Sequence, residues 1–196
     1  AGAAAGGKLG SMAGAKTANM AINAAGAIRR APESFDAALG KQLDLANGNT
    51  YYQDAAEIRK FKENEDNIQY VTDMMTAENN GKAPTRKEVK ERMEQYTPFL
   101  EKGMRDIKSI SKAYKVANTY GLKREEVAKI AVVGQNRGIT KDVLNDDKKS
   151  KAALSNLNQE FLDKKYSANQ AKMLSDRSIN VLKAMNGVSH NLQRRQ

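Results

Sequence analysis

Residues 107–133 read IKSISKAYKVANTYGLKREEVAKIAVV, and they carry two helical patterns in succession. In the first, Ile107, Ile110 and Tyr114 recur at the three- and four-residue spacing of one helix face. Gly121 then ends the helix, because glycine readily adopts the left-handed conformation found at helix C-termini. In the second pattern, Val127 and Ile130 form an inward face. The stretch therefore predicts two helices joined by a tight turn.

Helical patterns continue on both sides of this stretch, and no segment alternates in the manner of a strand. Thr85 and Glu88 form a capping-box motif, and Thr140 is a further helix cap. We expect a loop at residues 134–138, because a glycine stands at each end of this segment. The sequence thus predicts an all-α fold, with helices at about 50–77, 85–96, 98–120, 123–133, 140–144, 148–165 and 168–186.

Small residues recur at every fourth position near the amino end. In a helix this spacing forms a stripe without bulky side chains, along which a second backbone can approach closely. Glycine costs about 1 kcal/mol relative to alanine inside a helix, so its repetition indicates packing against a partner. We interpret residues 1–31 as a glycine-zipper segment and residues 32–196 as a basic all-helical body. The predicted oligomer interface consists of Gly2, Gly6, Gly10, Gly14 and Ala18.

The composition argues against an enzyme. The 196 residues contain no cysteine and a single histidine, His190, which excludes thiolate and multi-histidine metal sites. The acidic pairs Glu125–Glu126 and Asp146–Asp147 are adjacent in sequence, so the members of each pair point to different sides of a helix and form no acid–base dyad. We expect no catalytic residue, no metal, no cofactor and no small-molecule substrate.

The charge predicts a polyanionic partner. The formal net charge is +10 at pH 7, from 33 Lys and Arg against 23 Asp and Glu. This excess favours sequence-independent binding to DNA or to an anionic membrane such as that of a host cell. The candidate contacts are Lys8, Lys16, Arg29 and Arg30 near the amino end, and Lys164, Lys165, Lys172, Arg177, Lys183, Arg194 and Arg195 near the carboxyl end.

Residues 111–133 also match the helix-turn-helix pattern, which gives an alternative function as a DNA-binding protein. Ala117 lies four residues before the turn residue Gly121, and Val127 follows that glycine by six. Glu125 and Glu126 oppose this interpretation, because acids in the first turn of a recognition helix repel phosphates. The basic residues that would meet phosphates are Lys123, Arg124 and Lys129.

A small-residue amino end followed by a basic, helical, cysteine-free body resembles the internal virion proteins, or ejection proteins, of short-tailed bacteriophages. The resemblance covers the overall layout, and its specific residues are Gly2, Gly6, Gly10 and Gly14. It implies an elongated, non-enzymatic, homo-oligomeric subunit of a larger assembly. Such a subunit is held in the virion interior and later enters the host cell envelope as part of a DNA conduit. A cytoplasmic protein, or a pore-forming secreted effector, is the remaining alternative.

Overall fold

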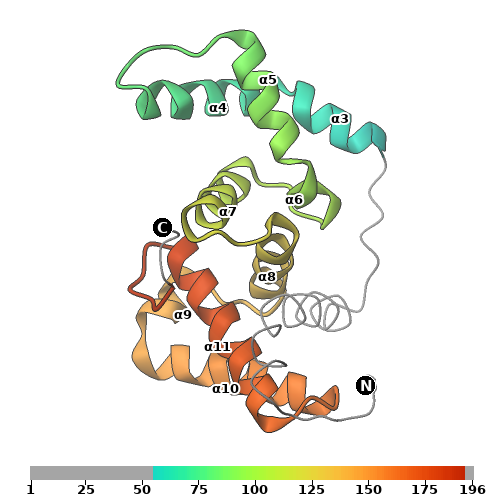
Figure 1. Cartoon of the computed structure of the whole chain (residues 1–196), viewed down its shortest axis with the longest axis vertical. Helices are drawn as coiled ribbons and strands as arrows, with labels where there is room; N and C mark the ends of the chain where they lie inside the picture. Colours follow the sequence, from blue (N-terminus) through green and yellow to red (C-terminus); the bar gives the residue numbers. More distant parts are fainter. Residues whose placement is uncertain (1–54, 193–196) are drawn as a thin grey trace, which may run out of the picture. The chain divides into compact units, whose positions relative to one another are not determined.

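The computed structural model describes residues 55–192, and within this range every regular element is an α-helix (Figure 1). The chain divides into two units, Ala1–Leu39 and Gly40–Gln196, and the described residues all belong to the second unit. The all-α prediction is confirmed for this part of the chain. The predictions for the glycine stripe, for Lys8, Lys16, Arg29 and Arg30, and for Arg194 and Arg195 lie outside the described residues.

The helices follow one another with short connections. None of the helices between residues 55 and 192 is both long and apolar enough to cross a membrane. In chain order they are α3 (Ala55–Glu63), α4 (Glu65–Glu78), α5 (Arg86–Gln95), α6 (Thr97–Glu101), α7 (Ile107–Tyr120), α8 (Arg124–Asn136), α9 (Lys141–Asn145), α10 (Asp147–Asp163) and α11 (Ala168–Met185).

Helices α7, α8 and α11 pack against one another and hold the main apolar core. Ile110 of α7, Ile130 of α8 and Leu174 of α11 are almost completely inaccessible to solvent. Between α7 and α8, Gly121 adopts φ 66° and ψ 35°, the left-handed conformation predicted for the turn. The N–H of Leu122 then donates to the carbonyl of Ala117 at 2.9 Å and closes the end of α7.

Helix α8 is buried on most of its circumference, because α6, α7 and α11 all contact it. Its glycine, Gly134, is part of this packing. A Cβ atom at that position would lie 2.7 Å from Cδ2 of Leu182, which is closer than real contacts allow. The absence of a side chain at Gly134 therefore lets α11 approach α8.

Helices α3, α4 and α5 have a much smaller apolar core. It consists of four buried side chains, Phe61, Val71, Val89 and Met93. Local capping defines the start of α5: the hydroxyl of Thr85 accepts from the Glu88 N–H, and the Glu88 carboxylate accepts from the Thr85 N–H at 2.8 Å. The second bond holds the pKa of Glu88 below its ordinary value.

Three predicted helix boundaries are wrong. The helix expected at 50–77 is interrupted, because the Asn64 side chain caps a new helix by accepting from the Asn67 N–H at 3.0 Å. The helix expected at 98–120 is broken at Gly103, whose φ of 102° is incompatible with a continuing helix. The loop expected at 134–138 begins later, since α8 runs to Asn136.

Candidate nucleic-acid interface

Helix α7 presents a row of lysines to solvent. Lys108, Lys112 and Lys115 are all exposed, and α7 contains no acidic residue. None of the three has a hydrogen-bond or ion-pair partner among residues 55–192. We call these three residues the lysine stripe of α7.

The lysine stripe is held on a rigid support. The spacing of four and then three residues places the lysines on one side of the helix, over about 10 Å of its axis. The opposite side is fixed in the core by Ile110, Ala113 and Ala117, of which none is more than 2% exposed. The positive charges are therefore aligned by a helix that cannot easily rotate.

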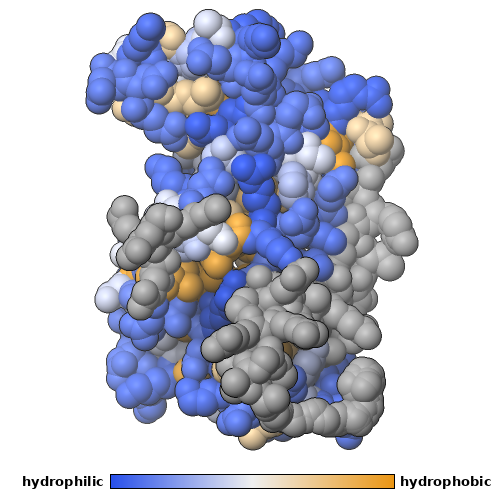
Figure 2. All heavy atoms as spheres, in the orientation of Figure 1, coloured by the Kyte–Doolittle hydropathy of each residue, from blue (hydrophilic) through white to orange (hydrophobic). Residues whose placement is uncertain are grey.

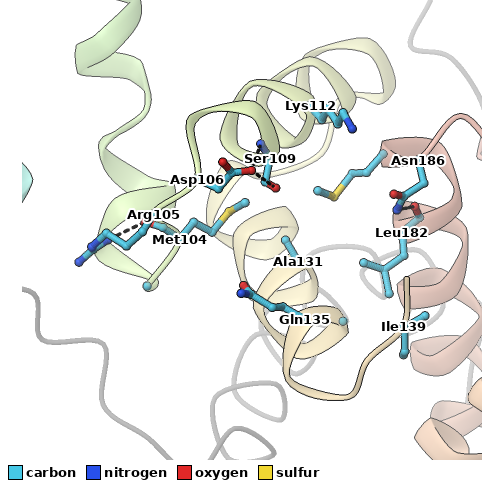
Figure 3. A pocket seen from close by; sticks show the side chains of 13 residues that line it. Met104, Arg105, Asp106, Ser109, Lys112, Ala131, Gln135, Ile139, Leu182 and Asn186 are labelled. Carbon is cyan, nitrogen blue, oxygen red and sulfur yellow. Dashed lines mark hydrogen bonds between the residues drawn. The ribbon is translucent and has the colours of Figure 1, made fainter. Parts of the chain in front are cut away.

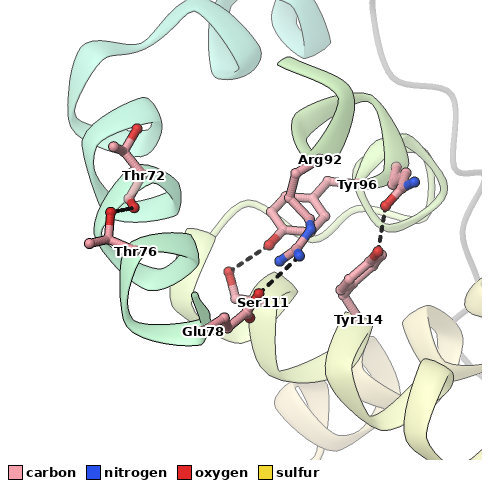
Figure 4. A network of polar contacts seen from close by, with 8 residues as sticks. Thr72, Thr76, Glu78, Arg92, Tyr96, Ser111 and Tyr114 are labelled. Atoms are coloured by element: carbon pink, nitrogen blue, oxygen red, sulfur yellow. Dashed lines mark hydrogen bonds and ion pairs between the residues drawn. The ribbon is translucent and has the colours of Figure 1, made fainter. Parts of the chain in front are cut away.

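A small cleft of about 190 Å³ lies on one side of the stripe and contains Lys115. The residues around this cleft are joined by a network of polar contacts (Figure 4). Arg92 donates to the carboxylate of Glu78 at 3.0 Å, and the hydroxyls of Tyr96 and Ser111 lie 3.1 Å apart. Tyr114 donates a hydrogen bond to the Gln95 side chain. The residues that line the cleft are Met74, Glu78, Arg92, Ser111, Tyr114, Lys115, Asn118 and Thr119.

Two arginines flank the ring of Tyr114 within this network. The guanidinium carbons of Arg92 and Arg124 lie 4.9 and 5.0 Å from the ring centroid. Burial lowers the pKa of Arg92, but its hydrogen bond to Glu78 and the charge of that carboxylate outweigh burial, so the pKa is raised overall. Burial also raises the pKa of the Tyr96 phenol. Arg92 thus stays charged and Tyr96 stays neutral around pH 7.

A larger groove of about 770 Å³ lies on the other side of the stripe and contains Lys112 (Figure 3). Apolar side chains of α8, α11 and the segments around them form its floor, and α7 supplies polar groups. Figure 2 shows apolar atoms near the middle of the visible face, among mostly hydrophilic ones. The groove residues are Gly103, Met104, Arg105, Asp106, Ser109, Lys112, Ala131, Gly134, Gln135, Ile139, Leu182, Met185 and Asn186.

The carboxyl-terminal basic residues lie in different environments. Nε of Arg177 donates to Oε1 of Glu126 at 2.6 Å, so this arginine is engaged inside the protein. Lys172 pairs with Asp176 at 2.8 Å. The other described members of this predicted set are Lys164 and Lys165, which are exposed in the turn before α11, and Lys183, which is half-buried.

The residues of the helix-turn-helix alternative form the α7–α8 hairpin. Ala117 and Val127 are buried, and Gly121 makes the turn. Glu126, in the first turn of α8, is only 3% exposed and faces Arg177 of α11. Of the three basic residues, Lys123 is exposed, Arg124 covers the Tyr114 ring and Lys129 is half-buried. Helix α8 therefore offers little free surface to a DNA groove, whereas α7 offers a basic one.

Sequence reasoning missed the lysine stripe, although a signal was present. Residues 107–120 contain three lysines and no acid in a chain with 23 acidic residues. Their spacing of four and three residues matches one helix face. The apolar residues of this segment give the stronger helical pattern, and the lysines lie on the opposite face.

Comparison of the chain with protein-family models, with curated proteins and with solved structures found no match. Within residues 55–192, no group of three or more His, Asp or Glu side chains is arranged to hold a metal ion.

Proposed function

We propose that this protein is a non-enzymatic structural subunit that contacts the phosphate backbone of duplex DNA through the lysine stripe of α7. The observation that carries the proposal is the set of three exposed lysines without partners on a helix that lacks acids. Phosphates attract such cations whatever the base sequence, and the released counterions drive binding. The proposed contact is therefore independent of sequence.

The geometry favours a backbone contact over base readout. Reading bases requires an exposed helix face with side chains that form paired hydrogen bonds to base edges. Lysine is a flexible point charge that suits phosphates, and the stripe contains no Asn, Gln or Arg. The exposed lysine face of α7 lies between the cleft and the groove, and its charges can meet phosphates along a duplex.

The larger role that we propose is that of an oligomeric subunit in an assembly that holds or conducts DNA, as in the ejection proteins that the layout resembles. In this proposal the glycine stripe at residues 1–31 joins copies of the chain, and α7 faces the nucleic acid. The virion interior followed by the host envelope remains the proposed location.

A titration with two unrelated duplexes of about 20 base pairs tests the proposal. If the stripe contacts three phosphates, log K should fall with log salt at a slope of about −2.7, which is about a 40-fold loss between ~50 and ~200 mM. Fluorescence anisotropy of labelled duplexes measures both quantities. Equal affinity for the two sequences is expected. A strong preference for one sequence would contradict the proposal and favour the helix-turn-helix alternative.

A further inference from the structure

The groove beside the lysine stripe has the composition of a protein-binding site. Its floor gathers five apolar side chains, Met104, Ala131, Ile139, Leu182 and Met185, in a volume of about 770 Å³. Figure 3 shows Ala131, Leu182 and Ile139 on one side of the groove and the α7 residues Ser109 and Lys112 on the other. DNA has no apolar side chains to fill such a floor.

Methionine gives part of this floor an adaptable surface. Unbranched methionine side chains can adjust to differently shaped apolar partners, and they are common in grooves that bind helices. Met104 is 5% exposed and anchored in the core, while Met185 at the end of α11 is half-buried and has more freedom. Leu182, which also packs against Gly134, is 4% exposed and is held in place like Met104.

The mouth of the groove is positive along α7. Lys112 lines the groove without a partner among the described residues, and Lys108 lies one turn earlier on the same face. The one acid at the mouth, Asp106, is already engaged, because its carboxylate accepts from the N–H and the hydroxyl of Ser109 at 3.1 and 2.8 Å. A partner with acidic groups beside its apolar side chains would complement this arrangement.

The length of the groove limits the size of that partner. From Asp106 to Lys112 the α7 wall covers about 9 Å, which is less than two helical turns. This length accommodates two apolar side chains at positions i and i+4 of a bound helix, with acids of the same helix facing the lysines. We infer that the groove binds an acidic amphipathic helix of a partner protein through two such apolar residues. The apolar floor is separate from the proposed DNA contact, whereas Lys108 and Lys112 take part in both, so peptide and DNA should compete for these two lysines.

A synthetic helix tests the inference with the full chain. The probe is a fluorescent peptide of about four turns (~14 residues), with leucines at i and i+4 of one face and glutamates beside them. Anisotropy should show binding that weakens at least about tenfold when serines replace the leucines or lysines replace the glutamates. Equal binding of the leucine and serine peptides would overturn the inference, because charge alone would then explain the attraction.

Variants of the groove complete the test. Met185→Glu places a charge on the floor and should weaken the leucine peptide at least about tenfold, while salt-dependent DNA binding stays unchanged. If that variant unfolds, Ala131→Leu, which fills the floor at a half-buried position, should give the same loss with an intact circular dichroism spectrum. Lys148→Glu, in the exposed start of α10, is the control and should change nothing. Unchanged peptide affinity in a folded floor variant, or binding of phosphatidylglycerol vesicles in place of the peptide, would overturn the inference.

Discussion

Helices α4 and α7 are equally long, 14 residues each, but they are opposite in charge and in packing. Helix α4 carries four acids and no base, and Val71 is its one buried residue. Helix α7 carries three lysines and no acid, and five of its residues are buried. This difference shows that the net charge of +10 is not spread evenly over the helices. Unpartnered positive charge lies on a helix that the core holds firmly.

The largest expected effect concerns stability. Ile110→Ala removes a fully buried side chain of α7 and should cost about 2–5 kcal/mol, because it leaves a cavity in the main core. Val71→Ala removes two buried carbons of α4 and should cost about 1.5 kcal/mol, at ~0.8 kcal/mol for each. Urea unfolding of both variants measures the difference.

Hydrogen exchange separates the two variants further. Ile110→Ala should accelerate exchange throughout α7, α8 and α11, since these helices share one core. Val71→Ala should accelerate it in α3, α4 and α5 alone. Equal losses of stability, or exchange that rises everywhere in the α4 variant, would show that the two regions form a single cooperative unit.

A smaller loss of stability is expected at the ion pair that joins α4 to α5. Glu78→Gln removes the partner of Arg92, in a pair joined at 3.0 Å, with side-chain exposures of 37% for Glu78 and 17% for Arg92. Since solvent screens the pair, the expected loss is about 0.5 kcal/mol. It should appear as faster amide exchange at the end of α4, with α8 unaffected. Ala77→Ser changes an exposed neighbour and is the matched control. Equal exchange rates in both variants would show that the ion pair does not stabilise the end of α4.

Local signals account for the parts of this fold that the sequence predicted. The capping box of Thr85, the cap at Thr140 and the stop at Gly121 depend on residues within a few positions of one another, so each can be recognised without the fold. Helical spacing likewise located α10 and α11 to within two residues of their observed ends.

Long-range packing accounts for the rest. Gly134 resembles a loop residue in sequence, but it lies within α8, and Leu182, 48 positions later, occupies the space that a side chain there would fill. Glu126 resembles an exposed acid, and it is buried because Arg177, 51 positions away, supplies its partner. The lysine stripe could be predicted as a helix face, but the grooves beside it depend on how several helices meet.

The lysine stripe is central to the proposed DNA contact, and matched charge variants test it most directly. The first variant replaces Lys108, Lys112 and Lys115 with Gln. The control replaces Lys141, Lys148 and Lys149, which are equally exposed but lie among Asp142, Asp146 and Asp147, where the local charges cancel. Both variants lose three positive charges.

The quantity to measure is the salt dependence of DNA affinity, by anisotropy of a labelled duplex. The α7 variant should lower the magnitude of the slope of log K against log salt by about 2.7, as expected when three phosphate contacts are lost. The control should keep the slope close to that of the unmodified protein. An equal decrease in both variants would show that net charge alone attracts DNA, and it would contradict the assignment of α7 as the DNA-binding surface.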